Sequence, residues 1–440
     1  MDLTIEKLIY GGDGLAHLPA DEHGPGKAVF VPFALEGERV EVTLVEQKPG
    51  FSRAHADRVL SPSRQRVSAQ CPYFTRCGGC HYQHSNYDHQ LEIKSSILKE
   101  NLRRIAKLEL ACELKIHPSP PWNYRNRTRL RVKRIPVFAL GYYKLNSHEL
   151  LSVEECPISS PLINRAIKAI WILGRAGEFG TSVEEIELFS NEDNQLLVEA
   201  YAGSYIASNK GRGIPLREFE ADTVEVWTEK LQKELPETIG VVLFQGTGPD
   251  GFGLLKTVGQ NQLIYKTKHA SYRVSAGSFF QTNRHLNDEL VDIVTAGRSG
   301  RTALDLYAGV GLFSVVLSRE FEHVIAVDTS HQSAADLEYN STANVKALCS
   351  TVDHYVSNVV GRLRPDLIVV DPPRSGLREK LAMNLAGLGA ERITYVSCDP
   401  ATLARDLVPL LTAGYHVEEA HLLDLFPQTF HLESVLHLAL

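Results

Sequence analysis

The sequence predicts a doubly wound, Rossmann-like α/β domain at the C-terminal end of the chain, preceded by a small β-barrel and a central α+β domain. Two observations carry this assignment. From Thr302 onward, short apolar strand patterns alternate with helical patterns, whereas residues 1–65 hold short strand patterns between Gly- and Pro-bearing turns. The chain of 440 residues is long enough for two or three domains. We therefore expect the barrel at 1–65, the central domain at 66–275 and the α/β domain at 276–440.

Composition and charge are those of an ordinary globular protein. Charged residues make up 22% and hydrophobic residues 43% of the chain, and no apolar run is long enough to span a bilayer. The N-terminus lacks a basic region followed by an apolar core, so we expect no secretory signal and a cytoplasmic location. The net charge of −7 argues mildly against a nucleic-acid partner, because phosphate contacts need Lys and Arg. A local basic face would outweigh that sum.

Residues 1–65 have the pattern of a small β-rich unit. Short apolar segments (LTIEKLIY, KAVFVPFAL and RVEVTLVEQK) are separated by the turn sequences GGDG and HGPG. About five short strands of this kind predict a small barrel, a fold that often binds oligonucleotides. A generic β domain with a solvated edge fits the same pattern.

Seven cysteines are spread unevenly along the chain, which argues against disulfides. Cys71, Cys77 and Cys80 lie together in the segment CPYFTRCGGC, and Cys156 in EECPI is a fourth candidate ligand. Three thiolates in one tight loop plus one distant thiolate can form a four-sulfur site, which suits zinc or an iron–sulfur cluster. Two histidines just after the segment are weaker candidates.

The central part contains a predicted helix and a basic strand. Residues 88–109 place apolar side chains on one side of a helix. The segment NYRNRTRLRVKR then carries a cation at every second position, namely Arg125, Arg127, Arg129, Arg131 and Lys133. Because side chains alternate in a strand, these cations share one face. Like charges repel across a sheet, so we interpret the face as a polyanion-binding surface rather than a merely solvated one.

A candidate cofactor loop follows the first strand of the α/β domain. DLYAGVGLFS places Gly309 and Gly311 between a strand and a helix, where glycine lets a ligand approach the backbone. The next strand ends in Asp328, an acid suited to a ribose hydroxyl pair, and a third strand ends in Asp353, a candidate for the nucleobase. The third glycine of a dinucleotide-binding loop is absent. The loop therefore favours S-adenosylmethionine over a dinucleotide, with packing alone as the other interpretation.

Further polar residues are predicted to lie near the same sheet edge. The strand ITYVS ends at Cys398 just before a helix, which is where open α/β sheets bind ligands. A buried structural cysteine is the alternative. Asp371 follows another strand in the rigid segment DPPRSGL, and Glu433 lies before the last apolar strand, where a solvated loop acid is the alternative. Gln281, in AGSFFQTN, is a side-chain amide just before a helix.

The quoted motifs occur along the chain in one order: CPYFTRCGGC, FFQTN, DLYAGVGLFS, DPPRSGL, SCDPATLARDL and FPQTFHLE. Together they resemble the S-adenosylmethionine-dependent RNA uracil-5 methyltransferases. The chain looks most like the 23S ribosomal RNA members, which carry an N-terminal TRAM domain and a [4Fe–4S] cluster. The resemblance covers nearly the whole chain and is least specific at its N-terminal end.

This resemblance implies a role for individual residues. Cys398 would be the nucleophile and Glu433 the general base. The positions around S-adenosylmethionine and the uracil would be Gln281, Tyr307, Gly309, Gly311, Asp328, Asp353 and Asp371. The cluster ligands would be Cys71, Cys77, Cys80 and Cys156.

Three positions depart from the family pattern. Asp328 stands where the family usually has Glu, which leaves the ribose contact with a shorter reach. Leu312 stands where some members have Asn, which removes a polar contact to the cofactor. Asp399 replaces a common Asn after the cysteine and puts little in doubt.

The implied activity is methylation of C5 of one uridine, in 23S ribosomal RNA, through a covalent bond between Cys398 and C6 of the uracil. We expect a monomer with a class I methyltransferase domain, S-adenosylmethionine and a [4Fe–4S] cluster as cofactors, and single-stranded or flipped-out RNA as partner. A transfer RNA uracil-5 methyltransferase of the same family is an alternative enzyme. A non-catalytic RNA-binding or assembly factor on the same scaffold is the alternative of another class, against which Cys398 and Glu433 argue.

Overall fold

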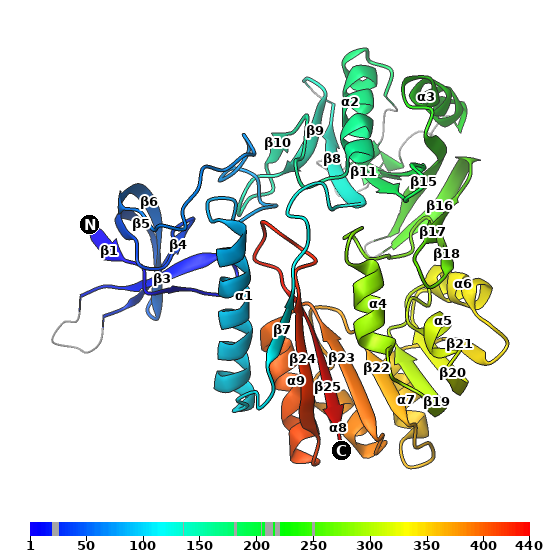
Figure 1. Ribbon diagram of the computed structural model, residues 1–440. Helices are drawn as coiled ribbons and strands as arrows, with labels where there is room; N and C mark the ends of the chain where they lie inside the picture. Colours follow the sequence, from blue (N-terminus) through cyan, green and yellow to red (C-terminus); the bar gives the residue numbers. More distant parts are fainter. Residues whose placement is uncertain are drawn as a thin grey trace.

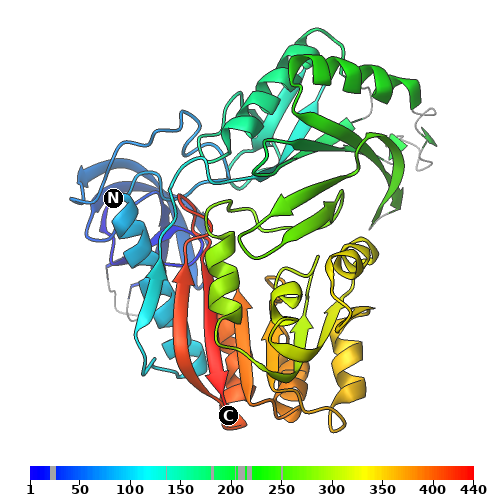
Figure 2. The same cartoon turned by 45° about the vertical axis from the view of Figure 1, so that its right-hand side comes forward.

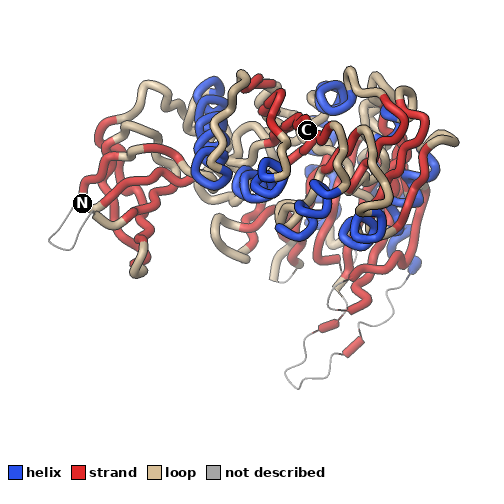
Figure 3. The backbone as a smooth tube through the Cα atoms, turned by 90° about the horizontal axis from the view of Figure 1, so that it is seen from below, coloured by secondary structure: helices blue, strands red, loops and turns tan. Residues whose placement is uncertain are grey.

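A computed structural model describes residues 1–19, 26–134, 136–179, 183–203, 205–206, 214–215, 221–248 and 251–440. Three large sheets organise these residues (Figure 1). The N-terminal sheet lies at one end of an elongated molecule, as the view from below shows (Figure 3). The hairpin of β17 (Gln262–Lys266) and β18 (Ser271–Ser275) lies between the other two sheets (Figure 2). None of the helices in the described residues combines the length and apolar character needed to cross a membrane.

The N-terminal sheet is a curled sheet with the strand order β1-β5-β6-β4-β3-β2. Its strands are β1 (Asp2–Thr4), β2 (Lys7–Leu8), β3 (Asp13–His17), β4 (Ala28–Pro32), β5 (Arg39–Gln47) and β6 (Phe51–Ser61). Alternate residues point to one face, where Val29, Val31, Val40 and Val42 form a small core. The strand-rich N-terminal unit predicted from the sequence is confirmed.

The central sheet has the order β10-β9-β8-β11-β12-β15-β16. Its strands are β8 (Arg127–Lys133), β9 (Ala139–Tyr143), β10 (Leu150–Ser152), β11 (Val183–Ser190), β12 (Leu196–Ala202), β15 (Thr238–Gly248) and β16 (Gly251–Gly259). The helices α2 (Pro161–Arg175) and α3 (Ala221–Glu234) share a hydrophobic core with this sheet. The side chain of Ser160 caps α2, and Pro161 occupies its first turn, where a missing N–H costs nothing. A short ladder joins β13 (Tyr205–Ile206) to β14 (Ile214–Pro215).

Strand β8 carries four of the five predicted cations, because it begins at Arg127 and leaves Arg125 before it, and its three arginines do not form a free cationic face. The glutamates of β11 and β12 neutralise them in ion pairs: Arg127 with Glu187 and Glu199, Arg129 with Glu185 and Glu187, and Arg131 with Glu185. The antiparallel register explains the pairing, because Arg129 lies opposite Glu187 and Arg131 opposite Glu185. The expectation of a polyanion-binding surface on this strand is therefore wrong for its three arginines.

The C-terminal sheet has the order β21-β20-β19-β22-β23-β25-β24-β7. Its strands are β7 (Leu114–His117), β19 (Gly300–Leu306), β20 (Phe321–Asp328), β21 (Val345–Cys349), β22 (Leu367–Val370), β23 (Arg392–Ser397), β24 (His416–Leu423) and β25 (Glu433–Ala439). Its helices are α4 (Asn287–Thr295), α5 (Ser314–Leu317), α6 (His331–Asn340), α7 (Val352–Val359), α8 (Glu379–Gly387) and α9 (Pro400–Thr412). Strands β19 to β23 run parallel, and β25 is antiparallel to both of its neighbours. The predicted doubly wound α/β fold is confirmed.

A segment from the predicted central domain packs against this C-terminal sheet. Helix α1 (Tyr87–Asn101) continues as a π-helical turn, η1 (Leu102–Ala106), and β7 then pairs parallel with β24 at the sheet edge. Figure 1 shows α1 standing between the N-terminal sheet and β24. Ile97 and Leu98 of α1 belong to the same buried cluster as Leu407 of α9. The domain boundaries at 65 and 275 stay a prediction.

Candidate active site

Cys398 lies directly after β23 and just before α9. Asp399 caps this helix, since one of its carboxylate oxygens accepts hydrogen bonds from the backbone N–H groups of Ala401 and Thr402, each at 3.0 Å. Pro400 starts the helix. The strand end and the capped helix hold the chain on both sides of the half-buried Cys398, so its thiol is placed at the carboxyl edge of the sheet.

Glu433 reaches the same edge on the neighbouring strand. Strands β23 and β25 pair antiparallel with Ser397 opposite Ser434, and this register aligns Cys398 with Glu433. The Glu433 side chain is buried, with the residue 5% exposed. Asp371 follows β22, the other neighbour of β23, and its backbone N–H donates to the carbonyl of Leu306 at 3.2 Å. Three residues far apart in the sequence therefore converge at one sheet edge.

The carboxyl groups of Glu433 and Asp371 both have raised pKa values. Burial raises the pKa of the Glu433 carboxyl well above its usual range, the charge of Asp371 raises it further, and Arg374 opposes both. Burial and then the charge of Asp305 raise the pKa of Asp371 to about 7. The negative charge of Asp371 therefore disfavours the ionised form of Glu433.

The thiol of Cys398 has a raised pKa in this environment. Burial raises its pKa to about 12, and the charges of Glu433 and Asp371 contribute in the same direction. Arg374, in the DPPR segment, is the nearby cation that favours the thiolate. The motif DPPRSGL contains this arginine, but no role was predicted for it from the sequence.

The glycine loop has the backbone conformation that its sequence predicts. Tyr307, Gly309 and Gly311 all have positive φ, at 65°, 56° and 93°. A Cβ atom on Gly311 would lie 2.7 Å from the Leu337 side chain, whereas nothing lies within 4 Å of one on Gly309. The Gly309 N–H donates to a carboxylate oxygen of Asp328 at 2.9 Å. The loop is thus held by Asp328 and leaves open space over Gly309, which suits the close approach of a nucleoside.

Asp353 occupies a different position from the one predicted. Strand β21 ends at Cys349, so Asp353 does not end a strand but lies exposed in the first turn of α7. Thr351 caps that helix, and the local hydrogen bond ends the strand early. Asp353 still lies near the glycine loop. Its charge acts on Tyr307 of that loop, whose pKa is raised to about 12 by burial first and by Asp353 second.

Gln281 is buried in the segment that joins β18 to α4. Its backbone carbonyl accepts a hydrogen bond from the Asn126 side chain at 3.1 Å. In the described part of the chain, no hydrogen bond joins the Gln281 side chain to Cys398, Asp371 or Glu433. The structure therefore leaves its contact with uracil or cofactor a prediction.

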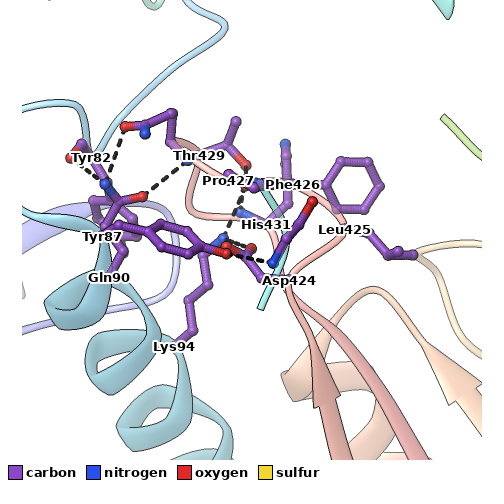
Figure 4. Close-up of polar contacts among 12 residues, drawn as sticks. Tyr82, Tyr87, Gln90, Lys94, Asp424, Leu425, Phe426, Pro427, Thr429 and His431 are labelled. Atoms are coloured by element: carbon purple, nitrogen blue, oxygen red, sulfur yellow. Dashed lines mark hydrogen bonds and ion pairs between the residues drawn. The ribbon is translucent and has the colours of Figure 1, made fainter. Parts of the chain in front are cut away.

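The loop between β24 and Glu433 is anchored to α1. Figure 4 shows the contacts: the Lys94 ammonium lies 2.5 Å from a carboxylate oxygen of Asp424 and 2.9 Å from the carbonyl of Phe426. The side-chain NH2 of Gln90 donates to the side-chain oxygen of Gln428 at 3.1 Å, and the backbone N–H of Gln428 donates to the side-chain oxygen of Gln90 at 3.0 Å. These contacts fix the position of residues 424–428, which precede Glu433 in the chain.

Replacing Lys94 by methionine is expected to destabilise the fold by about 3–5 kcal/mol, since the carboxylate of Asp424 would be left buried without its charge partner. Both side chains are fully buried, at 0% exposure. Urea unfolding followed by circular dichroism measures the loss. Lys99→Met, on the exposed side of the same helix, is the matched control and is expected to change stability by less than about 0.5 kcal/mol. Equal stability of the two variants would contradict the structural role of the ion pair.

The four predicted metal ligands line one cavity of roughly 70 Å³: Cys71, Cys77, Cys80 and Cys156. The Cys71 N–H donates to the Gln83 side chain, and the Cys156 N–H donates to Asn164. In the described residues, no group of three or more His, Cys, Asp or Glu side chains is arranged to hold a metal ion. The cluster therefore stays a proposal.

Comparison with known proteins decides the family. The model of the tRNA (uracil-5-)-methyltransferases matches residues 254–440, and that of the TRAM domain matches residues 1–56. An uncharacterized RNA methyltransferase of Aquifex aeolicus is 33% identical over 443 residues, which cover 99% of this chain and 97% of that protein. The chain belongs to the S-adenosylmethionine-dependent RNA uracil-5 methyltransferase family.

This methyltransferase has further relatives along its full length. An uncharacterized RNA methyltransferase of Halalkalibacterium halodurans is 31% identical over 454 residues, covering 99% of this chain and 96% of that protein. The crystal structure of Pyrococcus abyssi tRNA (uracil-54, C5)-methyltransferase in complex with S-adenosyl-L-homocysteine covers 100% of both chains, with a TM-score of 0.72 and 24% identity. At that identity the likeness shows the fold. The enzyme is thus an RNA methyltransferase with an N-terminal TRAM domain.

Proposed function

We propose that the enzyme methylates C5 of a uridine in RNA through a covalent bond between the Cys398 sulfur and C6 of the uracil. The observation that carries the proposal is the convergence of Cys398, Glu433 and Asp371 at the carboxyl edge of one sheet, beside the glycine loop. A thiol, two acids of raised pKa and an arginine are the groups that this reaction needs.

The chemistry assigns a task to each side chain. C5 of uracil is a poor nucleophile, and bond formation between the Cys398 sulfur and C6 converts the ring into an enolate. S-adenosylmethionine supplies an electrophilic methyl group when bound, beside Gly309, Asp328 and Tyr307. Glu433 in its ionised form then takes the C5 proton, after which the C6–S bond breaks and releases Cys398. A protonated carboxyl of the Asp371 and Glu433 pair can donate to the uracil oxygen and stabilise the enolate.

The thiol must lose its proton before it attacks. The charge of Arg374 favours the thiolate of Cys398. A guanidinium nitrogen of Arg374 lies 3.2 Å from the imidazole Nε2 of His431, and His431 belongs to the loop that precedes Glu433.

We infer 23S ribosomal RNA as the substrate, from the order of motifs and the four-cysteine segment. Transfer RNA is the second candidate, favoured by the solved Pyrococcus abyssi enzyme, which is named for uracil 54 of tRNA. Mapping 5-methyluridine in both RNAs from a strain that lacks the gene, and restoring it with the purified enzyme, tests the choice. If the strain lacks a 5-methyluridine in tRNA while the 5-methyluridines of its 23S RNA are unchanged, the inference is refuted.

The cavity lined by the four cysteines is proposed to hold a [4Fe–4S] cluster. Arg125 lines the same cavity, and its buried Nε atom has no hydrogen-bond partner. Among the described residues, no carboxylate forms an ion pair with this half-buried guanidinium. An iron–sulfur cluster with four thiolate ligands is an anion, which suits a cavity lined by a half-buried arginine that forms no ion pair with a carboxylate among the described residues. The residues present therefore fit the group.

Replacing Arg125 by methionine is expected to lower the midpoint potential of the cluster by an amount on the order of 50–100 mV, because loss of a nearby cation disfavours the more negative, reduced state. Redox titration of anaerobically purified protein measures the shift. Arg125→Lys keeps the charge and is expected to retain most of the wild-type potential. Zinc in place of iron in the wild-type protein would overturn the cluster proposal itself.

A further inference from the structure

A tyrosine of the TRAM domain reaches the end of the strand that carries Cys398. Tyr10 lies in the turn between β2 and β3, and its hydroxyl donates a hydrogen bond to the backbone carbonyl of Cys398 at 3.0 Å. The two residues are separated by 388 positions in the sequence. The N-terminal domain is therefore in direct contact with the peptide group of the proposed nucleophile.

The turn that carries Tyr10 is shaped for this approach. The N–H of Gly12 donates to the carbonyl of Ile9 at 3.1 Å and closes the turn. Gly12 has a φ of 94°, and a Cβ atom there would lie 2.9 Å from the Cβ atom of His81 in the cysteine-rich segment. Glycine is required on both counts. The GGDG motif thus lets the TRAM domain dock tightly next to the active site.

The ring of Tyr10 packs against Phe430, in the loop that precedes Glu433. Its centroid lies 5.3 Å from that of Phe430, with the planes at 88°, an edge-to-face arrangement. Phe430 stands three positions before Glu433 and also packs against His81, at 4.6 Å, and His431, at 4.1 Å. One side chain therefore contacts the backbone at Cys398 with its hydroxyl and the loop before Glu433 with its ring.

The Tyr10 hydroxyl remains a donor throughout the working pH range. Burial raises the pKa of Tyr10 above its ordinary value, and the charge of Asp399 raises it further. A neutral phenol keeps its proton and has a fixed geometry on a rigid ring. Its hydrogen bond to the Cys398 carbonyl therefore does not change with pH near neutrality.

We propose that Tyr10 is a positioning residue of the methyl-transfer reaction, which holds the Cys398 peptide group through its hydroxyl and the Glu433 loop through its ring. The inference rests on the proposed function, because it assumes that Cys398 is the nucleophile. It assigns the TRAM domain a part in catalysis: its docking completes the alignment of thiol and base. Small errors in the position of reacting groups lower rates strongly, so one restraint on the backbone has a measurable effect.

Tyr10→Phe tests the proposal, because it removes the hydroxyl and keeps the ring on Phe430. We expect kcat and the single-turnover rate of adduct formation with 5-fluorouridine-substituted RNA to fall roughly five- to tenfold, the equivalent of one hydrogen bond. The KM for RNA and the melting temperature are expected to stay unchanged. Tyr82→Phe is the matched control, since the buried Tyr82 hydroxyl has no hydrogen-bond partner among the described residues.

Two results would overturn the proposal. The first is wild-type kcat and adduct rate in Tyr10→Phe. The second is a raised KM for RNA with both rates unchanged, which would make Tyr10 an RNA-binding residue. Failure of the proposed function has a different signature, because Cys398→Ala would then still form the adduct, whatever Tyr10→Phe does.

Discussion

Replacing Cys398 by alanine is expected to reduce methyl transfer by at least about 10³-fold, because the variant has no group to add to C6 of the uracil. Without that addition C5 stays a poor nucleophile, and the remaining side chains have no enolate to stabilise. The transfer of labelled methyl groups from S-adenosylmethionine to RNA measures the loss. Incubation with 5-fluorouridine-substituted RNA, followed by a denaturing gel, is expected to show an adduct with the wild-type enzyme and none with the variant.

Cys112→Ala is the matched control for this experiment. Cys112 is half-exposed, lies between η1 and β7 and lines none of the site described above, so its removal is expected to leave the methylation rate and the adduct unchanged. An adduct that persists in Cys398→Ala would assign the nucleophile to another residue. Loss of activity in both variants, with both proteins folded, would point to a general sensitivity of the enzyme to cysteine removal.

Replacing Glu433 by glutamine is expected to stop the reaction after methyl transfer, and turnover should fall by about 10²–10⁴-fold. The amide cannot accept the C5 proton, so the bond between the Cys398 sulfur and C6 cannot break. A methylated covalent complex should therefore accumulate on ordinary, unsubstituted RNA. Mass spectrometry of the ribonuclease-treated complex measures the mass of the added methylated nucleotide on the peptide that contains Cys398.

Glu391→Gln provides the control, since this exposed acid precedes β23 at the opposite end of the strand from Cys398. It is expected to turn over at the wild-type rate without accumulating a complex. If Glu433→Gln loses turnover without trapping a covalent species, Glu433 acts before the methyl transfer and is not the base that removes the C5 proton.

The strand and helix periods of the C-terminal domain were sufficient to predict its elements. Each strand expected after Thr302 is present, because parallel strands buried on both faces have short apolar runs that stand out from helical patterns. The end of β21 was predicted too late, since the helix cap at Thr351 competes with the strand, and Asp353 moved into a helix. Boundaries of this kind depend on local hydrogen bonds that periodicity does not reveal.

The basic strand shows a second limit of the sequence. Alternation correctly placed Arg127, Arg129 and Arg131 on one side of β8, but it said nothing of the strand that lies beside it. The register of β11 brings Glu185 and Glu187 opposite two of these arginines, and the charge is neutralised within the sheet. A pattern within one strand determines its own faces, whereas the partner of each face is decided by pairing over long distances in the chain.

The sequence by itself determined the fold class, the TRAM and methyltransferase family and the candidate residues, because local periodicity and short motifs are written in consecutive positions. Only the tertiary structure decided which of those residues meet. The antiparallel register of β23 and β25 aligns Cys398 with Glu433, the buried pair of Lys94 and Asp424 anchors the loop, and a turn at Gly12 brings Tyr10 to the Cys398 carbonyl. The last two contacts join residues separated by 330 and 388 positions, and all three depend on strand pairing or packing across the fold rather than on a local pattern.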